Sequence, residues 1–124
     1  MNFITKKILA EAITRPEALE MLGDFRSKAE AGVFKKDGEK QDGITKDNIY
    51  EVFKEAEEEI KGRETLVVTL GVEFGKEDLQ KIGEKIKGDF LLEFRYEPEL
   101  LGGAKLAWKG QEKDYSLRKK LQEL

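Results

Sequence analysis

The stretch from Gly71 to Lys76 is the part of this chain whose residue types and spacing come closest to a reaction site. Gly71, Gly75 and Lys76 follow a short apolar run and precede a helical pattern, which is the order found in a phosphate-binding loop. Such a loop needs four residues between its glycines, whereas three stand here, and Glu77 occupies the place of the hydroxyl residue that would bind magnesium. We therefore interpret this stretch as an ordinary turn between a strand and a helix.

Any other chemistry would have to come from carboxylates and lysines. The sequence contains no cysteine and no histidine, which removes thiol nucleophiles, the usual zinc ligands and the commonest general base. Glu57, Glu58 and Glu59 are consecutive, so on a helix their side chains point in different directions and form a solvated face. Because no nucleophile stands beside a base, we expect no catalytic residue, no metal ligand and no cofactor.

The composition describes a highly charged chain. Lys and Arg number 23 and Asp and Glu number 26, which gives a net charge of −3 and no basic excess of the kind that nucleic-acid binding requires. No apolar run reaches the ~20 residues of a membrane helix, and the first residues lack the apolar centre of a signal peptide. We expect a cytoplasmic protein with no nucleic-acid partner and no direct membrane insertion.

Periodicity predicts an α+β fold with two regions. Residues 1–62 carry two to three amphipathic helices, because apolar residues recur at helical spacing before Pro16, up to Gly32 and again from Ile49 to Ile60. A polar run that contains glycine predicts an exposed loop near 33–44. Residues 63–124 follow the order β-α-β-β-α, and strands expected at 65–70, 90–96 and 104–108 give a small three-stranded sheet.

A turn with unusual backbone requirements precedes the last expected strand. Pro98 follows Glu97, and the pair Gly102-Gly103 comes shortly after. Residues without a side chain permit positive φ angles or a close approach of two backbones, which a strand entering a crowded turn would need. A Gly-Gly pair is common by itself, so its meaning depends on the residues C-terminal to it.

The residues after the pair read as an alternating strand, a polar turn around Gly110, and the start of a helix at Asp114, Ser116 and Arg118. A carboxylate or a hydroxyl at a helix start accepts hydrogen bonds from unpaired N–H groups, and both are favoured at the positive end of the helix dipole. These residues build the fold, and we assign none of them a catalytic role.

This order of features resembles the C-terminal domain of the F-type ATP synthase delta subunit, the bacterial relative of the oligomycin-sensitivity-conferring protein (OSCP). From about Thr65 to Leu124 the chain is similar to the family's strand, helix, strand, acidic-Pro-x-Leu-x-Gly-Gly turn, strand and Asp-x-Ser-x-Arg-x-x-Leu ending. The family carries a bundle of six helices before this domain, whereas the sequence here offers three amphipathic segments at most. The resemblance thus implies a reduced helical region at 1–62 and a delta-like C-terminal α/β domain at 63–124.

The resemblance also implies a function without catalysis. In the family, the delta subunit is part of the peripheral stalk, or stator, which resists the torque of the rotor during proton-driven ATP synthesis. Its C-terminal domain holds the C-terminal helix of the b subunit, and its N-terminal domain contacts the N-termini of the alpha subunits on the F1 head. The implied partners are these two segments, and the implied location is the inner face of the cell membrane, through the complex.

Holding a helix requires an exposed apolar groove with a polar rim. The last strand and helix supply four candidates that cannot all be buried in a small core: Trp108, Leu117, Leu121 and Leu124. Packing within their own domain is the alternative for each of them. Trp108 is the best candidate for an anchor, because large aromatic rings are enriched at the centres of interfaces.

Two other classes of protein remain open. The E subunit of archaeal or vacuolar-type rotary ATPases has a C-terminal domain of similar layout, although its long N-terminal stalk helix is interrupted here by Pro16, Gly32, Gly38 and Gly43. A small free-standing α+β domain that binds or converts a small molecule is the other alternative. A response to a b-subunit peptide and not to metabolites would favour the stalk subunit.

Overall fold

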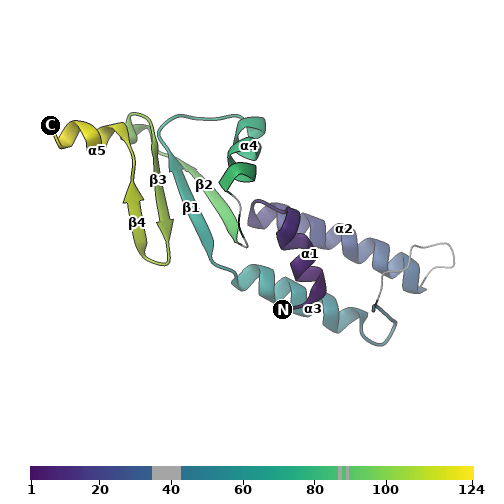
Figure 1. The fold of residues 1–124 in the computed structure, drawn as a ribbon. Coiled ribbons are helices and arrows are strands. Elements are labelled where there is room, and N and C mark those ends of the chain that lie inside the picture. Colours follow the sequence, from purple (N-terminus) through teal and green to yellow (C-terminus); the bar gives the residue numbers. More distant parts are fainter. Residues whose placement is uncertain (35–42, 87, 89) are drawn as a thin grey trace. The chain divides into compact units, whose positions relative to one another are not determined.

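The computed structural model describes residues 1–34, 43–86, 88 and 90–124, and its backbone contacts divide the chain into two compact units, Met1–Arg63 and Glu64–Leu124 (Figure 1). The described elements of the first unit are helices, and the second unit contains a sheet with helices. The fold is therefore α+β, as the sequence predicts. Most of the loop expected near 33–44 falls on residues 35–42, which lie outside the described residues.

The first unit packs three helices against one another. Their bounds are α1 Phe3–Glu11, α2 Arg15–Phe34 and α3 Ile49–Gly62. α2 begins beside Pro16, whose fixed φ suits the first turn of a helix. It continues past Gly32, where we expected it to end, and this glycine is a buried residue within the helix.

Asn2 ties α1 to α3 within the first unit. Its side-chain oxygen accepts a hydrogen bond from the N–H of Ile4 at 2.8 Å and so caps α1. Its side-chain amide donates to the carbonyl oxygen of Val52 at 2.8 Å, and its backbone N–H donates to the Glu59 carboxylate at 3.1 Å. One residue thus connects the start of α1 to two turns of α3.

The second unit contains a four-stranded sheet in the order β2-β1-β3-β4. Its elements follow the chain in this order: β1 Thr65–Leu70, α4 Lys76–Ile86, β2 Leu91–Tyr96, the 3-10 helix η1 Pro98–Leu100, β3 Ala104–Trp108, β4 Gln111–Asp114 and α5 Leu117–Gln122. β1 pairs in parallel with β2 and antiparallel with β3, and β3 pairs antiparallel with β4. The parallel pair needs a crossover connection, which α4 supplies.

The fourth strand corrects the expected sheet of three strands. We interpreted Lys109 to Lys113 as a polar turn, but Lys109 and Gly110 alone form it, with φ angles of 49° and 82°. The next four residues pair with β3, with Asp114 opposite Lys105. A strand at the edge of a sheet needs no apolar alternation, and charged side chains protect its free edge from other chains. The polar sequence of β4 therefore gave no indication that it is a strand.

The register of the strands gives the sheet one apolar and one polar face. Val68, Phe94 and Leu106 are cross-strand neighbours and share a face, because opposed residues point to the same side. Leu79 of α4 lies with Phe94 on this face. Thr69 and its neighbours point to the other face: Arg95 and Lys105. Helix α4 thus covers part of the apolar face.

Candidate functional site

The end of β1 and the turn before β3 come into backbone contact at Gly71, Gly102 and Gly103, which we call the glycine crossing. The N–H of Gly71 donates to the carbonyl oxygen of Gly103 at 3.1 Å. A Cβ at Gly71 would lie 2.4 Å from the nitrogen of Gly102, and one at Gly103 would lie 2.5 Å from the carbonyl oxygen of Tyr115. Gly102 and Gly103 also have φ angles of 127° and 74°, which side chains disfavour. The crossing therefore excludes side chains for two separate reasons.

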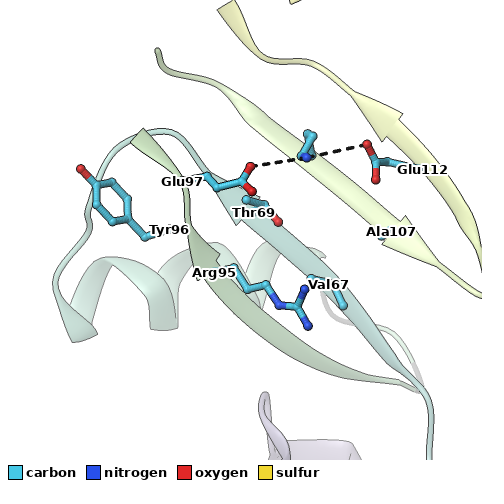
Figure 2. Close-up of a pocket in the computed structure, with 8 residues that line it drawn as sticks. Val67, Thr69, Arg95, Tyr96, Glu97, Ala107 and Glu112 are labelled. Carbon is cyan, nitrogen blue, oxygen red and sulfur yellow. Dashed lines mark ion pairs between the residues drawn. The ribbon is translucent and has the colours of Figure 1, made fainter. Parts of the chain in front are cut away.

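Glu97 and Pro98 guide the chain into this crossing. The N–H of Glu97 donates to the carbonyl oxygen of Leu70 at 2.9 Å, and Pro98 is the first residue of η1. The Glu97 carboxylate lies 3.4 Å from the ammonium of Lys105, which is also 3.8 Å from the Glu112 carboxylate. These ion pairs join the end of β2 to β3 and β4 across the polar face (Figure 2).

Figure 2 shows a shallow pocket of about 470 Å³ on the polar face, and Lys105 is one of the residues that line it. Its cations are already paired, because Lys105 lies between two glutamates and the Arg95 guanidinium is 2.8 Å from the Glu93 carboxylate. Thr69 supplies a hydroxyl to the lining, but this residue is only 7% exposed. We interpret the lining of this pocket as a network of ion pairs that stabilises the sheet, and we assign the pocket no reaction.

The segment that follows β4 is bound to the glycine crossing before it enters α5. The N–H of Tyr115 donates to the carbonyl oxygen of Ala104 at 2.8 Å, and the N–H of Leu117 donates to that of Gly102 at 3.1 Å. Ser116, between them, is fully buried. The start of α5 is therefore held by backbone hydrogen bonds to the turn and strand that precede it in the sheet.

Asp114 and Ser116 form the N-terminal cap of α5. The Ser116 hydroxyl oxygen accepts from the N–H of Lys119 at 3.2 Å, and the Asp114 carboxylate accepts from the N–H of Ser116 at 2.8 Å. Hydrogen bonds from the hydroxyl and the N–H of Ser116, with a smaller contribution from the charge of Arg118, hold the pKa of Asp114 below its ordinary value of 3.8. This cap determines where α5 begins and which way its side chains point.

Leu117, Leu121 and Leu124, which we call the α5 patch, stand at helical spacing along α5 and the residues after it. Their exposed fractions are 45%, 50% and 100%, and α5 contains no buried residue. Packing inside the unit therefore covers only about half of Leu117 and Leu121 and none of Leu124. Three basic residues stand between them: Arg118, Lys119 and Lys120.

Trp108 lies at the opposite end of β3 from α5. Its ring centroid is 5.6 Å from that of Phe90, and the Lys109 ammonium is 5.4 Å from the ring centre. The indole is half-buried and lines, with Leu106, a recess of about 490 Å³. Because the four steps from Ala104 to Trp108 span about 13 Å of strand, the structure brings the three leucines together and places the tryptophan apart from them.

The described residues offer little for other kinds of site. No group of three acidic, histidine or cysteine side chains in them could hold a metal ion. Among the helices of residues 1–34, 43–86 and 90–124, none combines the length and the apolarity needed to cross a membrane.

The sheet, the capped helix and its exposed leucines together define a class of protein. It is a small α+β protein with exposed apolar side chains on a firmly capped helix, as in a protein-binding surface. The ATP synthase delta (OSCP) subunit family matches residues 44–124, more than half of the chain. The chain therefore belongs to the ATP synthase delta (OSCP) subunit family, and the resemblance seen in the sequence is confirmed. Neither the curated proteins nor the solved structures gave a match.

Membership of this family makes the chain a peripheral-stalk subunit of an F-type ATP synthase, which is a structural and not a catalytic component. The match begins at residue 44 and so includes α3. The resemblance that we recognised begins later, at about Thr65, because the turn and cap motifs that carry it all lie in the second half of the chain.

Three residues that bear on the site escaped the sequence analysis. Gly71 appeared there only as part of an unsuitable phosphate loop, although it forms one side of the glycine crossing. Leu101 and Tyr115 are 58% and 55% exposed and flank the segments that hold α5. The contact of Gly71 with the Gly102-Gly103 pair joins segments far apart in the chain, so no local pattern could have indicated it.

Proposed function

We propose that this subunit links the b-subunit stalk to the catalytic F1 head and so supports proton-driven ATP synthesis at the inner face of the cell membrane. In this role it binds other polypeptides and transmits force. The observation that carries the proposal is the α5 patch, in which a chain of the delta family exposes two leucines on a capped helix and a third just after it. Exposure of this kind is costly for a subunit that has nothing to bind.

The α5 patch is the proposed binding site for the C-terminal helix of the b subunit. Leucines at i, i+4 and i+7 form a ridge that can pack into the groove of a partner helix. The three basic residues between Leu117 and Leu121 outnumber the single acid of the segment, Glu123, so they would attract acidic side chains and repel basic ones. We therefore expect the b segment to carry acidic residues beside its apolar ones.

Trp108 is proposed as a second anchor for the same partner. It lines an open recess together with Leu106, and a half-buried indole of this kind can lose its remaining water on binding. A partner helix would need about nine residues, at 1.5 Å each, to span the length of β3 from the start of α5 to Trp108. Contact with both places is therefore within the reach of one helix.

The first unit is the proposed contact for the N-terminus of the alpha subunit. Among the apolar side chains that it leaves exposed are Phe3 and Tyr50, at 40% and 63%. Its three packed helices would present these rings from a stable surface. This part of the proposal does not depend on the α5 patch, so one of the two can be wrong while the other holds.

Calorimetric titration of the full chain with a synthetic peptide from the C-terminal end of the cognate b subunit tests the main proposal. Leu121→Ser should weaken binding by at least about tenfold, and Trp108→Ala should cost about 2 kcal/mol or more, as for hot-spot residues. Gln122→Ala, on the same helix, should bind like the wild type. If Leu121→Ser and Trp108→Ala both keep the wild-type affinity and circular dichroism spectrum, neither the α5 patch nor Trp108 is the binding site.

A further inference from the structure

The loop between β1 and α4 and the end of β2 form a second apolar surface of the unit Glu64–Leu124. Val72, Phe74 and Tyr96 are 53%, 39% and 51% exposed. They line a recess of about 200 Å³, which we call the loop recess. Three more apolar side chains, from the sheet and from α4, belong to its lining: Leu70, Leu79 and Phe94.

The fold itself does not require apolar residues at the mouth of this recess. Turns between a strand and a helix lie at the surface and are usually polar. Val72 and Phe74 keep a large part of their surface in water, so their burial contributes little to folding. Single exposed apolar residues are ordinary, but three around one recess indicate a docking surface.

The charges beside the loop recess are mainly acidic. Segment 72–78 has three acids and one base, hence a net charge of −2, from these residues: Glu73, Glu77, Asp78 and Lys76. Arg95 also lines the recess, but its guanidinium is 2.8 Å from the Glu93 carboxylate, which neutralises it. The α5 patch has the opposite character, since segment 117–124 has three bases and one acid: Arg118, Lys119, Lys120 and Glu123.

We infer that the loop recess docks an apolar side chain presented by a basic segment of a partner polypeptide, at a site separate from the α5 patch. The acidic residues attract such a segment and repel an acidic one, while the recess takes the apolar side chain between the basic ones. The two surfaces of this unit then select segments of opposite charge. This inference does not depend on the b subunit being the partner of the α5 patch.

A matched pair of fluorescein-labelled peptides tests the inference by fluorescence anisotropy with the full chain. Both peptides carry leucines at i, i+4 and i+7, with lysines between the leucines in one and glutamates in the other. The lysine peptide should bind the wild type, lose at least about tenfold in affinity with Phe74→Ser or Val72→Ser, and bind Leu121→Ser normally. Raising the salt concentration should weaken the binding of the lysine peptide to the wild type.

The glutamate peptide separates this inference from the proposed function, because it should respond to Leu121→Ser and not to Phe74→Ser. Failure of that peptide alone would count against the α5 patch only. The inference about the loop recess would be overturned if the lysine peptide did not bind the wild type. It would also be overturned if this peptide bound the Phe74→Ser and Val72→Ser proteins as tightly as the wild type, with unchanged circular dichroism. Self-association of the free protein that Val72→Ser abolishes would also overturn it, because the occupant would then be a second copy.

Discussion

Gly71 shows how a single residue can matter through a contact with a distant segment. Its φ angle is not left-handed, so the demand for glycine there is steric: a Cβ would meet the backbone of Gly102 at 2.4 Å. Neither backbone can yield easily, because the neighbouring Gly103 accepts the hydrogen bond of Gly71. The close approach of the end of β1 to the turn before β3 therefore needs glycine at a position that looks replaceable in the sequence.

We expect Gly71→Ala to lower the free energy of unfolding of the unit that contains the sheet by about 1–3 kcal/mol, the usual cost of overpacking. Urea unfolding followed by the fluorescence of Trp108, the single tryptophan of the chain, measures it. Gly75→Ala is the matched control, because a Cβ there meets nothing within 4 Å. Equal stability of the two variants would mean that the crossing can widen at little cost.

Asp114 makes the stability of the same unit depend on pH. Hydrogen bonds from Ser116 hold its pKa below 3.8 in the folded protein, so the folded state binds a proton less readily than the unfolded chain. The contribution of the Asp114 carboxylate to stability is therefore fully present at pH values above 3.8, the ordinary pKa, and is lost as the pH falls through the lower pKa of the folded state. We expect Asp114→Asn to be less stable than the wild type at neutral pH.

The test of this prediction is the difference in urea midpoint between the two proteins, measured from about pH 7 down to about pH 3. The difference should narrow on acidification, because protons bind the unfolded carboxylate more readily than the folded one and so reduce the stability that its charge contributes. A difference that stays constant over this range would show that the loss comes from geometry and not from charge.

At the scale of elements, α1 is attached to α3 through Asn2. Asn2→Ala removes both the cap of α1 and the hydrogen bond to the carbonyl oxygen of Val52, so it should cost about 1–2 kcal/mol. Amide hydrogen exchange of α1 should accelerate accordingly. Asn2→Ser keeps a capping oxygen and loses only the bond to Val52, so its exchange should fall between those of the wild type and Asn2→Ala. Identical exchange in all three proteins would contradict the attachment.

Helix α5 shows a different relation between an element and its surroundings. It has only six residues and no buried side chain, so neither length nor core packing stabilises it. Its order comes from the Ser116 cap and from the backbone hydrogen bonds of Tyr115 and Leu117 to the strand and the turn. This arrangement leaves Leu117 and Leu121 about half exposed.

At the scale of the whole molecule, the division into two compact units raises the question of whether each folds alone. The division of the chain into domains at 1–62 and 63–124 remains a prediction. We expect residues 64–124, expressed alone, to unfold cooperatively with the Trp108 fluorescence change of the full chain. A domain of about 60 residues is near the lower limit of independent stability, so a lower urea midpoint is consistent with this. A fragment without a cooperative transition would show that the units depend on each other.

The features that could be predicted from the amino-acid sequence are local. Apolar periodicity indicated the helices of the first unit and three of the strands, and the Asp114 and Ser116 cap was readable because its hydrogen bonds join residues within three positions of each other. The Gly102-Gly103 pair likewise indicated a constrained turn. The family resemblance rested on these same local motifs.

The contacts between distant segments became visible in the folded structure. It showed that β4 is a strand, because its pairing with β3 and not its polar sequence holds it in place. It also separated Trp108 from the α5 patch, and it brought Tyr96 to Val72 and Phe74 to form the loop recess. The physical reason is that hydrogen bonds and periodicity within an element act over a few residues, whereas contacts between elements depend on the order of strands in the sheet, which no local spacing encodes.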